Sequence, residues 1–86
     1  MARISDRCVI QLVDQQIVIK DDISGVELVF PPDQHQALAE RLAETAAKGM
    51  HEWLNLEVAG QSGVIAIPPA AIPNAQAALS YLRQYV

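Results

Sequence analysis

The sequence predicts a two-layer α+β domain, in which a mainly antiparallel sheet of five strands carries two helices on one face. Two observations lead to this prediction. Short segments rich in β-branched residues alternate with helix-forming segments in the order βββαββα. A strand-like segment also runs twice into a proline pair before a helical segment, at Pro31-Pro32 and at Pro68-Pro69. The chain has 86 residues and no low-complexity linker, so we expect a single domain over residues 1–86.

Three strands are expected before the first proline pair. Residues 7–13 are nearly all apolar, and their β-branched side chains favour a strand over a helix. Residues 17–20 form the return strand after a short polar turn, and residues 26–30 form the third strand after Ser24-Gly25. Pro31-Pro32 ends this strand, because proline has no amide hydrogen for the ladder.

Helix signals follow. Asp33 is the predicted N-cap of the first helix, and Gly49 suits the left-handed position just after its end. In the second half, residues 53–58 and 64–67 are expected to form strands. A final helix is expected to start near Pro73.

The second half therefore resembles the first, and an internal repeat of strand, Pro-Pro and helix is a hypothesis. Ser24-Gly25-Val26 precedes the first proline pair as Ser62-Gly63-Val64 precedes the second. The two shared motifs lie one residue out of register between the copies. On this alignment a duplication requires a small insertion or deletion.

Charge and cysteine content exclude several function classes. The formal net charge is −4 and the sequence pI is about 4.9, which disfavours direct binding to nucleic acid. No stretch of about 20 unbroken apolar residues is present to cross a membrane. Cys8 is the single cysteine and has no partner for an intrachain disulfide. With no signal-peptide pattern at the start, we expect a cytoplasmic protein.

No stretch has the residue types and spacing of a known catalytic, cofactor or metal site. His35 and His51 have no second ligand-type residue at helical spacing. Asp21-Asp22 is interpreted as a solvated turn pair instead of paired catalytic carboxylates. We therefore predict no catalytic residues, no cofactor and no metal.

The distribution of charge is more informative. No charged residue occurs from Val58 to Leu82, so the last helix lacks the charged stripe of an ordinary surface helix. Interface cores are depleted in charge and enriched in aromatic residues. Apolar residues on the outer face of the sheet would also leave a patch that monomers usually avoid. The predicted partner or dimer interface consists of Val9, Val13, Val29, Trp53, Leu79, Tyr81, Leu82 and Tyr85.

Part of the first half resembles a known family. Residues 8–12, residues 17–22 and Gly25, followed by residues 28–30 and Pro32, have the order of elements of the small actinobacterial BldB-like proteins. The resemblance implies a three-stranded unit that leads into a helix. It also implies association with helix-turn-helix regulators encoded nearby. No functional residue is carried over from it.

The leading hypothesis is a non-enzymatic cytoplasmic protein–protein interaction module that forms a homodimer or binds another protein, as a regulatory partner or adaptor. A first alternative is an acidic, antitoxin-like inhibitor that covers a basic surface of a nucleic-acid enzyme. A second alternative is a small enzyme that uses Cys8 or His51. The inhibitor would use Asp14, Asp21, Asp22, Glu27, Glu40 and Glu44.

Overall fold

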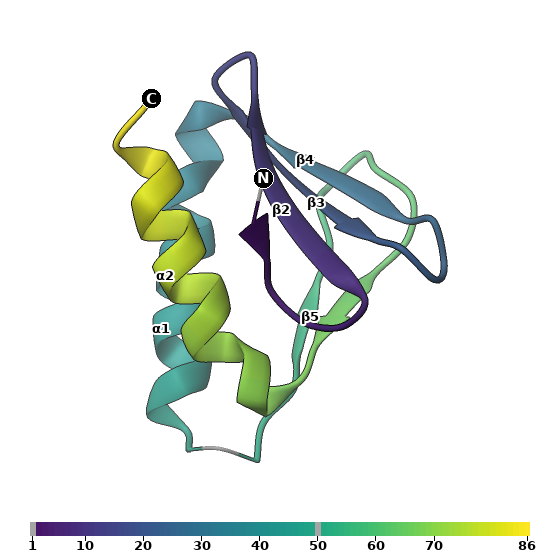
Figure 1. Ribbon diagram of the computed structural model, residues 1–86, viewed down its shortest axis with the longest axis vertical. Helices are drawn as coiled ribbons and strands as arrows, with labels where there is room; N and C mark the ends of the chain where they lie inside the picture. The colour runs from purple at the N-terminus through teal and green to yellow at the C-terminus, as the bar shows by residue number, and fades with distance from the viewer. Residues whose placement is uncertain (1, 50) are drawn as a thin grey trace.

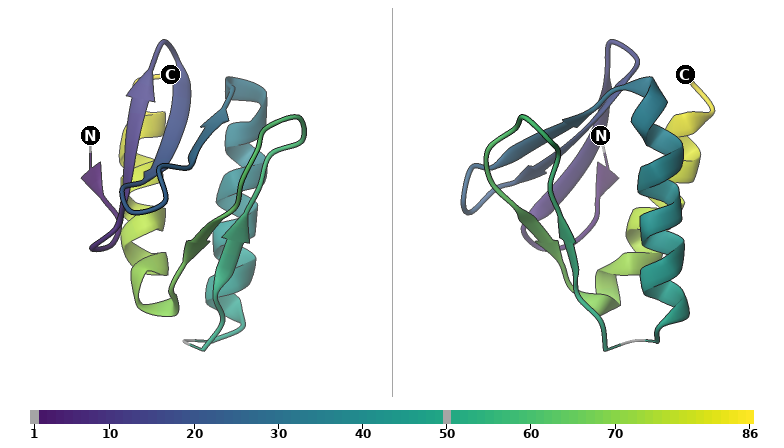
Figure 2. Two further views of the ribbon diagram at one scale, coloured as in Figure 1. Left: turned by 90° about the vertical axis from the view of Figure 1, so that its right-hand side faces the viewer. Right: turned by 180° about the vertical axis from the view of Figure 1, so that it is seen from behind.

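The computed structural model describes residues 2–49 and 51–86 and shows an α+β fold with two helices and two antiparallel sheets (Figure 1). Both helices lie on the same side of the strands (Figure 2). The first sheet has the order β1-β2-β3-β4, and β5 pairs only with β6. The strands are β1 (Ala2–Arg3), β2 (Cys8–Val13), β3 (Gln16–Asp21), β4 (Glu27–Phe30), β5 (Leu54–Leu56) and β6 (Ile65–Ile67).

The prediction of one five-stranded sheet is therefore wrong in detail, although the α+β class is confirmed. The outer edge of β4 bonds to a side chain instead of a strand. The backbone N–H of Val29 donates to Oε1 of Gln61 at 2.8 Å, and Nε2 of Gln61 donates to the carbonyl oxygen of Val29 at 2.8 Å. Gln61 belongs to the loop between β5 and β6, and its amide makes the two bonds that a neighbouring strand would make.

Each proline pair lies between the end of a strand and the start of the next helical segment. Pro31 and Pro68 are extended, with ψ of 165° and 156°, and the proline after each one opens a 3₁₀ turn. Proline fits there because the first amide of a helical turn has no partner. The turn η1 (Pro32–Gln34) leads into α1 (His35–Ala47), and η2 (Pro69–Ala71) leads into α2 (Ile72–Arg83).

The predicted N-cap at Asp33 is wrong, since Asp33 lies inside η1. Gln34 takes the N-cap position of α1 and makes no capping bond through its side chain. The buried His35 ring bonds instead to the carbonyl oxygen of Phe30, with 2.8 Å between Nε2 and O. A tertiary contact thus holds the start of α1 against the end of β4. Gly49, with φ of +99°, has the left-handed conformation expected after the helix.

The structure repeats itself at a constant spacing of 37 residues. In β3 and β4, Ile17 pairs with Phe30 and Ile19 with Leu28; in β5 and β6, Leu54 pairs with Ile67 and Leu56 with Ile65. Leu54 lies 37 residues after Ile17, and Ile67 lies 37 residues after Phe30. The loops between these pairs have equal length, so no insertion or deletion is required. We call residues 16–47 the first copy and residues 53–84 the second copy.

The same spacing holds in the helices. Every buried residue of α1 has a buried residue of α2 as its counterpart 37 positions later. The two Ser-Gly-Val motifs are not equivalent, because the counterpart of Val26 at this spacing is Gly63. The buried helical residues are His35, Leu38, Leu42 and Thr45 in the first copy, and Ile72, Ala75, Leu79 and Leu82 in the second.

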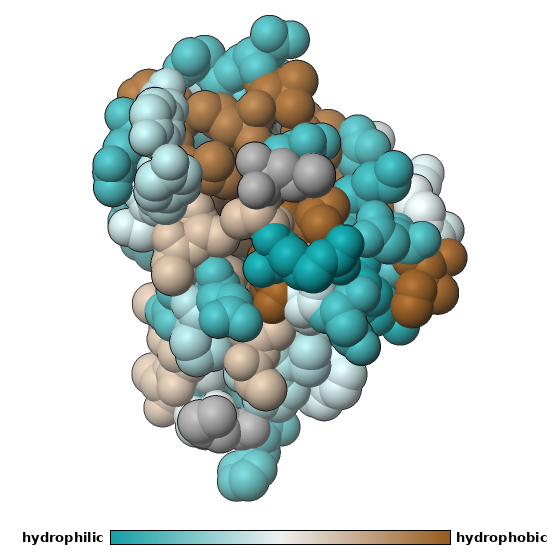
Figure 3. Space-filling view, in the orientation of Figure 1, coloured by the Kyte–Doolittle hydropathy of each residue, from teal (hydrophilic) through white to brown (hydrophobic). Residues whose placement is uncertain are grey.

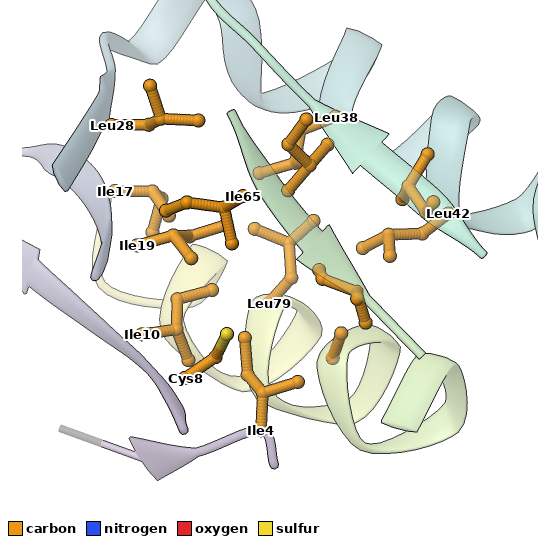
Figure 4. Packing of buried hydrophobic residues seen from close by; sticks show 14 of the residues in the cluster. Ile4, Cys8, Ile10, Ile17, Ile19, Leu28, Leu38, Leu42, Ile65 and Leu79 are labelled. Carbon is orange, nitrogen blue, oxygen red and sulfur yellow. The ribbon is translucent and has the colours of Figure 1, made fainter. Parts of the chain in front are cut away.

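The core lies between the strands and the two helices and is almost entirely aliphatic (Figure 4). Side chains from both copies meet in it, and Ile4 and Cys8 close the end beside β1. Leu79 and Leu82 belong to this core with 2% and 6% exposure, so their assignment to a partner interface is wrong. None of the described helices is long and apolar enough to cross a membrane.

Candidate functional site

The structure separates the predicted interface residues into two groups. Val9 is only 8% exposed, so it offers little surface to a partner, and the assignment of Val9 to an exposed apolar patch is wrong. It lies outside the core cluster because alternate residues of a strand point to opposite faces, and Cys8 and Ile10 take the inner one. Val29 is half-buried. The exposed members of the set are Val13, Trp53, Tyr81 and Tyr85.

Tyr81 and Tyr85 form an exposed pair one turn apart near the end of α2. Their ring centroids are 5.5 Å apart at an interplanar angle of 65°, the edge-to-face arrangement that aromatic rings favour. The hydroxyl of Tyr85 donates to the hydroxyl oxygen of Tyr81 at 3.2 Å, and this bond raises the pKa of Tyr85. The two rings remain 57% and 56% exposed. The pair is thus an ordered aromatic surface.

Further apolar residues lie at the same end of the molecule. Helix α2 packs beside β2, and Nδ2 of Asn74 donates to the carbonyl oxygen of Ile4 at 3.3 Å near the start of the helix. Toward its other end, α2 and the β2–β3 turn lie at the same end of the fold (Figures 1 and 2). Figure 3 shows hydrophobic residues gathered there. We define the tyrosine patch as Val13, Tyr81, Tyr85 and Val86, all of which are exposed.

The first copy carries different residues at the equivalent positions. The counterpart of Tyr81 is Glu44, and the counterpart of Tyr85 is Lys48. Glu44 and Lys48 are exposed and have the spacing of a weak surface ion pair. At the same place in the repeat, the first copy therefore has an ordinary charged surface and the second has exposed aromatic rings.

A groove lies along the contact between α1 and α2. Its volume is about 560 Å³, within the range of small-molecule sites. Leu42 and Leu79, which are counterparts in the repeat, line its apolar part. The other lining residues are Ala39 from α1, Gln76, Ser80 and Arg83 from α2, and Gln84 directly after α2.

Asp21 is part of a structural cluster beside the first sheet. Nη2 of Arg7 donates to Oδ2 of Asp21 at 2.8 Å, and the backbone N–H of Ile23 donates to Oδ1 at 2.9 Å. The hydrogen bond from Arg7 lowers the pKa of Asp21 to about 2, and the backbone donors of Ile23 and Ser24 lower it further. Burial of the carboxylate opposes them. The cluster organises the β3–β4 turn.

The proposed acidic surface is therefore smaller than the sequence suggested. Asp21 is buried and ion-paired with Arg7, and Asp22 pairs with Arg3 at 3.1 Å. Asp21 is therefore not available to cover a basic surface of another protein, whereas Asp22 remains exposed in its pair with Arg3. The two carboxylates also bind different arginines, so they are not a catalytic pair.

Cys8 lacks the properties of a nucleophile. Its side chain is fully buried in the core, and this burial raises the pKa of the thiol, whereas a reactive cysteine requires a lowered pKa. His51 is exposed in the segment that connects α1 to β5. Among residues 2–49 and 51–86, no group of three or more His, Cys, Asp or Glu side chains is placed to hold a metal ion.

Known proteins do not extend these observations. Comparison with protein-family models, with curated proteins and with solved structures finds no match to this chain. The resemblance to BldB-like proteins therefore stays a prediction.

The groove was not anticipated from the sequence. Its polar residues Gln76, Ser80 and Gln84 were interpreted only as the uncharged surface of the last helix. A usable signal was present in the spacing of the two proline pairs, which is also 37 residues (31 and 68). An alignment at that spacing places the polar residues of the second helix against alanines of the first.

Proposed function

We propose that this chain is a non-enzymatic, cytoplasmic interaction module that forms a homodimer through the tyrosine patch and serves as a regulatory partner or adaptor. The observation that carries the proposal is the substitution within the repeat. Tyr81 near the end of α2 and Tyr85 just after it take the positions that Glu44 and Lys48 have at the end of α1. The cytoplasmic part of the proposal is supported by the free thiol of Cys8.

The physical chemistry of the patch favours a protein partner. Two ordered aromatic rings present a large apolar area at a small entropic cost, and tyrosine is enriched at interface hot spots. Each phenol also keeps a hydroxyl that can bond to a partner. While the two rings remain in contact with water, their apolar area contributes no hydrophobic free energy. A partner that covers both rings buries this area and gains that free energy.

A second copy of the chain is the occupant that fits best. The patch contains no charged residue, so it is not suited to a strongly basic or acidic partner. In the part of the chain that the structure describes, β1 pairs with β2 only at Val9 and Ile10. The last residues of β2, Gln11 to Val13, therefore pair with β3 on one side and have no strand partner among the described residues on the other. Two copies related by a two-fold axis can pair the free edge of β2 in one copy with the same edge in the other. This arrangement brings both tyrosine patches into one contact.

The test compares the wild-type chain with Tyr81→Glu/Tyr85→Lys, which copies the first helix onto the second and adds no net charge. We expect the wild-type chain to sediment as a dimer at micromolar concentration and the double variant as a monomer. Both residues are exposed, so the variant keeps the circular dichroism spectrum and loses about 1 kcal/mol of unfolding free energy, mainly the ring–ring contact.

The matched control is Glu44→Gln/Lys48→Gln at the equivalent positions of α1, which should leave the dimer unchanged. A wild-type chain that is monomeric over the whole concentration range contradicts the homodimer. A double variant that still sediments as a dimer contradicts the assignment of the contact to the tyrosine patch.

A further inference from the structure

The groove between α1 and α2 has two unlike walls. At the repeat spacing, the counterparts of Gln76, Ser80, Arg83 and Gln84 are Ala39, Ala43, Ala46 and Ala47. Of these four alanines, Ala39 lines the groove, together with Leu42 of α1. The short side chain of Ala39 leaves space on the α1 side, and the residues of the other side supply hydrogen-bonding groups along the groove.

The charge in this groove is a single uncompensated cation. Nη2 of Arg83 donates to Oε1 of Gln36 at 3.0 Å, and a neutral amide does not cancel the positive charge of the guanidinium. Among the described residues, Arg83 takes part in no salt bridge. Among the described residues, no carboxylate lines the groove, and Glu40, one turn after Gln36 on α1, is not part of its lining.

These features select one class of ligand. A guanidinium matches a carboxylate in geometry, and the amides of Gln76 and Gln84 with the hydroxyl of Ser80 can donate further hydrogen bonds. A single cation in a chain of net charge −4 disfavours a multiply charged phosphate. The apolar part of the lining is Ala39, which is half-buried, with the edges of the largely buried Leu42 and Leu79, and it favours an apolar body.

We infer that the groove between α1 and α2 binds a small organic carboxylate, whose acid group pairs with Arg83 and whose apolar body lies against Ala39 and the edges of Leu42 and Leu79 that line the groove. This site is separate from the tyrosine patch. Gln76, Ser80, Arg83 and Gln84 occupy the flank of α2 that faces α1, whereas Asn74 bonds on the opposite flank, toward β1 and β2.

The test uses the full chain and two probes with the same aliphatic body, octanoate and octanamide, in a titration followed by amide NMR shifts. We expect octanoate to cause saturable shifts in the groove-facing residues of α1 and α2. Octanamide, which has no charge, should bind about tenfold more weakly. The variant Arg83→Gln should weaken octanoate binding about tenfold and leave octanamide binding unchanged.

Arg41→Gln is the matched control, because Arg41 is an exposed arginine like Arg83 but lies on α1 and donates to the carbonyl oxygen of Asn55 outside the groove. It should leave binding of both probes unchanged. Ala39→Leu fills the groove and should abolish binding of both probes. If this variant fails to fold, the affinities of wild type and Arg83→Gln for the two probes still test the inference.

Equal affinities for octanoate and octanamide, or an unchanged affinity in Arg83→Gln, would overturn the inference. Shifts confined to the tyrosine patch, or spread over many sites without saturation, would do the same. The Tyr81→Glu/Tyr85→Lys variant should still bind octanoate. Failure of the dimer and failure of the ligand site are therefore observed separately.

Discussion

A Cβ atom added to Gly63 would lie 2.8 Å from Cγ1 of Val26. The two residues are counterparts in the repeat, so the two copies touch each other at equivalent positions. The contact joins the turn before β4 to the turn before β6. It explains why a residue without a side chain is needed at Gly63, in addition to its positive φ of 93°.

Gly63→Ala should therefore destabilise the fold more than Gly60→Ala. Both glycines have positive φ, 93° and 85°, and each substitution costs about 1 kcal/mol for that reason. Only the new methyl group at Gly63 meets Val26, since nothing lies within 4 Å at Gly60. Overpacking adds about 1–3 kcal/mol, measured as the free energy of unfolding in urea.

Val26→Ala should recover part of this loss in the double variant, because it removes the methyl groups that the new Cβ meets. If Gly63→Ala and Gly60→Ala had the same free energy of unfolding, the turns before β4 and β6 would be able to move apart without loss of stability.

Gln61→Ala should free the outer edge of β4. The substitution removes both bonds to the backbone of Val29, and we expect a loss of about 2 kcal/mol together with faster hydrogen exchange of the Val29 amide. Gln61→Glu should slow that exchange relative to Gln61→Ala, because a carboxylate still accepts from the amide but does not donate to the carbonyl. Unchanged exchange in both variants would contradict the role of Gln61.

Asp21 should make the fold sensitive to acid. Its pKa is about 2 in the folded chain, below the ordinary 3.8, so the ionised form stabilises the fold. This contribution is fully present above about pH 4 and is lost as the pH falls toward 2. Asp21→Asn should lower stability at neutral pH by about 2 kcal/mol and flatten the loss between pH 4 and 2, measured by urea unfolding at several pH values.

Asp22→Asn is the control for this prediction, because Asp22 and its partner Arg3 are both largely exposed. An acid profile that is the same in wild type and Asp21→Asn would mean that other groups cause the acid sensitivity.

Cys8 should not react with thiol reagents while the chain is folded. Its thiol is buried and its pKa is raised, so both access and ionisation are unfavourable. We expect labelling by a maleimide or a disulfide reagent at neutral pH to follow the rate of unfolding and to accelerate in urea. Rapid labelling without denaturant would revive the hypothesis of a cysteine nucleophile.

Much of the architecture could be predicted from local patterns. The strands at residues 8–13, 16–21 and 27–30 and both helices follow from β-branched residues, proline stops and helix formers. Asp33 was misassigned because its sequence position is typical of an N-cap, while the prolines before it impose a 3₁₀ turn. The single sheet was misassigned because no local pattern reveals that Gln61 occupies the edge of β4.

The candidate site could be predicted only in part. Tyr81 and Tyr85 were found because an uncharged helix with aromatic residues is unusual. Leu79 and Leu82 were included with them because helical periodicity alone does not say which apolar face a small core takes. From the sequence, Arg83 is recognisable only as the one charged residue of the last helix, and its place in a groove depends on its neighbours on α1.

By itself, the sequence determined the order of the elements, the places where proline ends each strand, and the lack of charge from Val58 to Leu82. These properties depend on each residue and its near neighbours along the chain. Only the tertiary structure decided which apolar residues form the core, that Val26 and Gly63 meet, and that Arg83 lines a groove with Ala39 of α1. Such relations join residues distant in sequence, and packing selects them by shape and hydrogen bonding that no local pattern encodes.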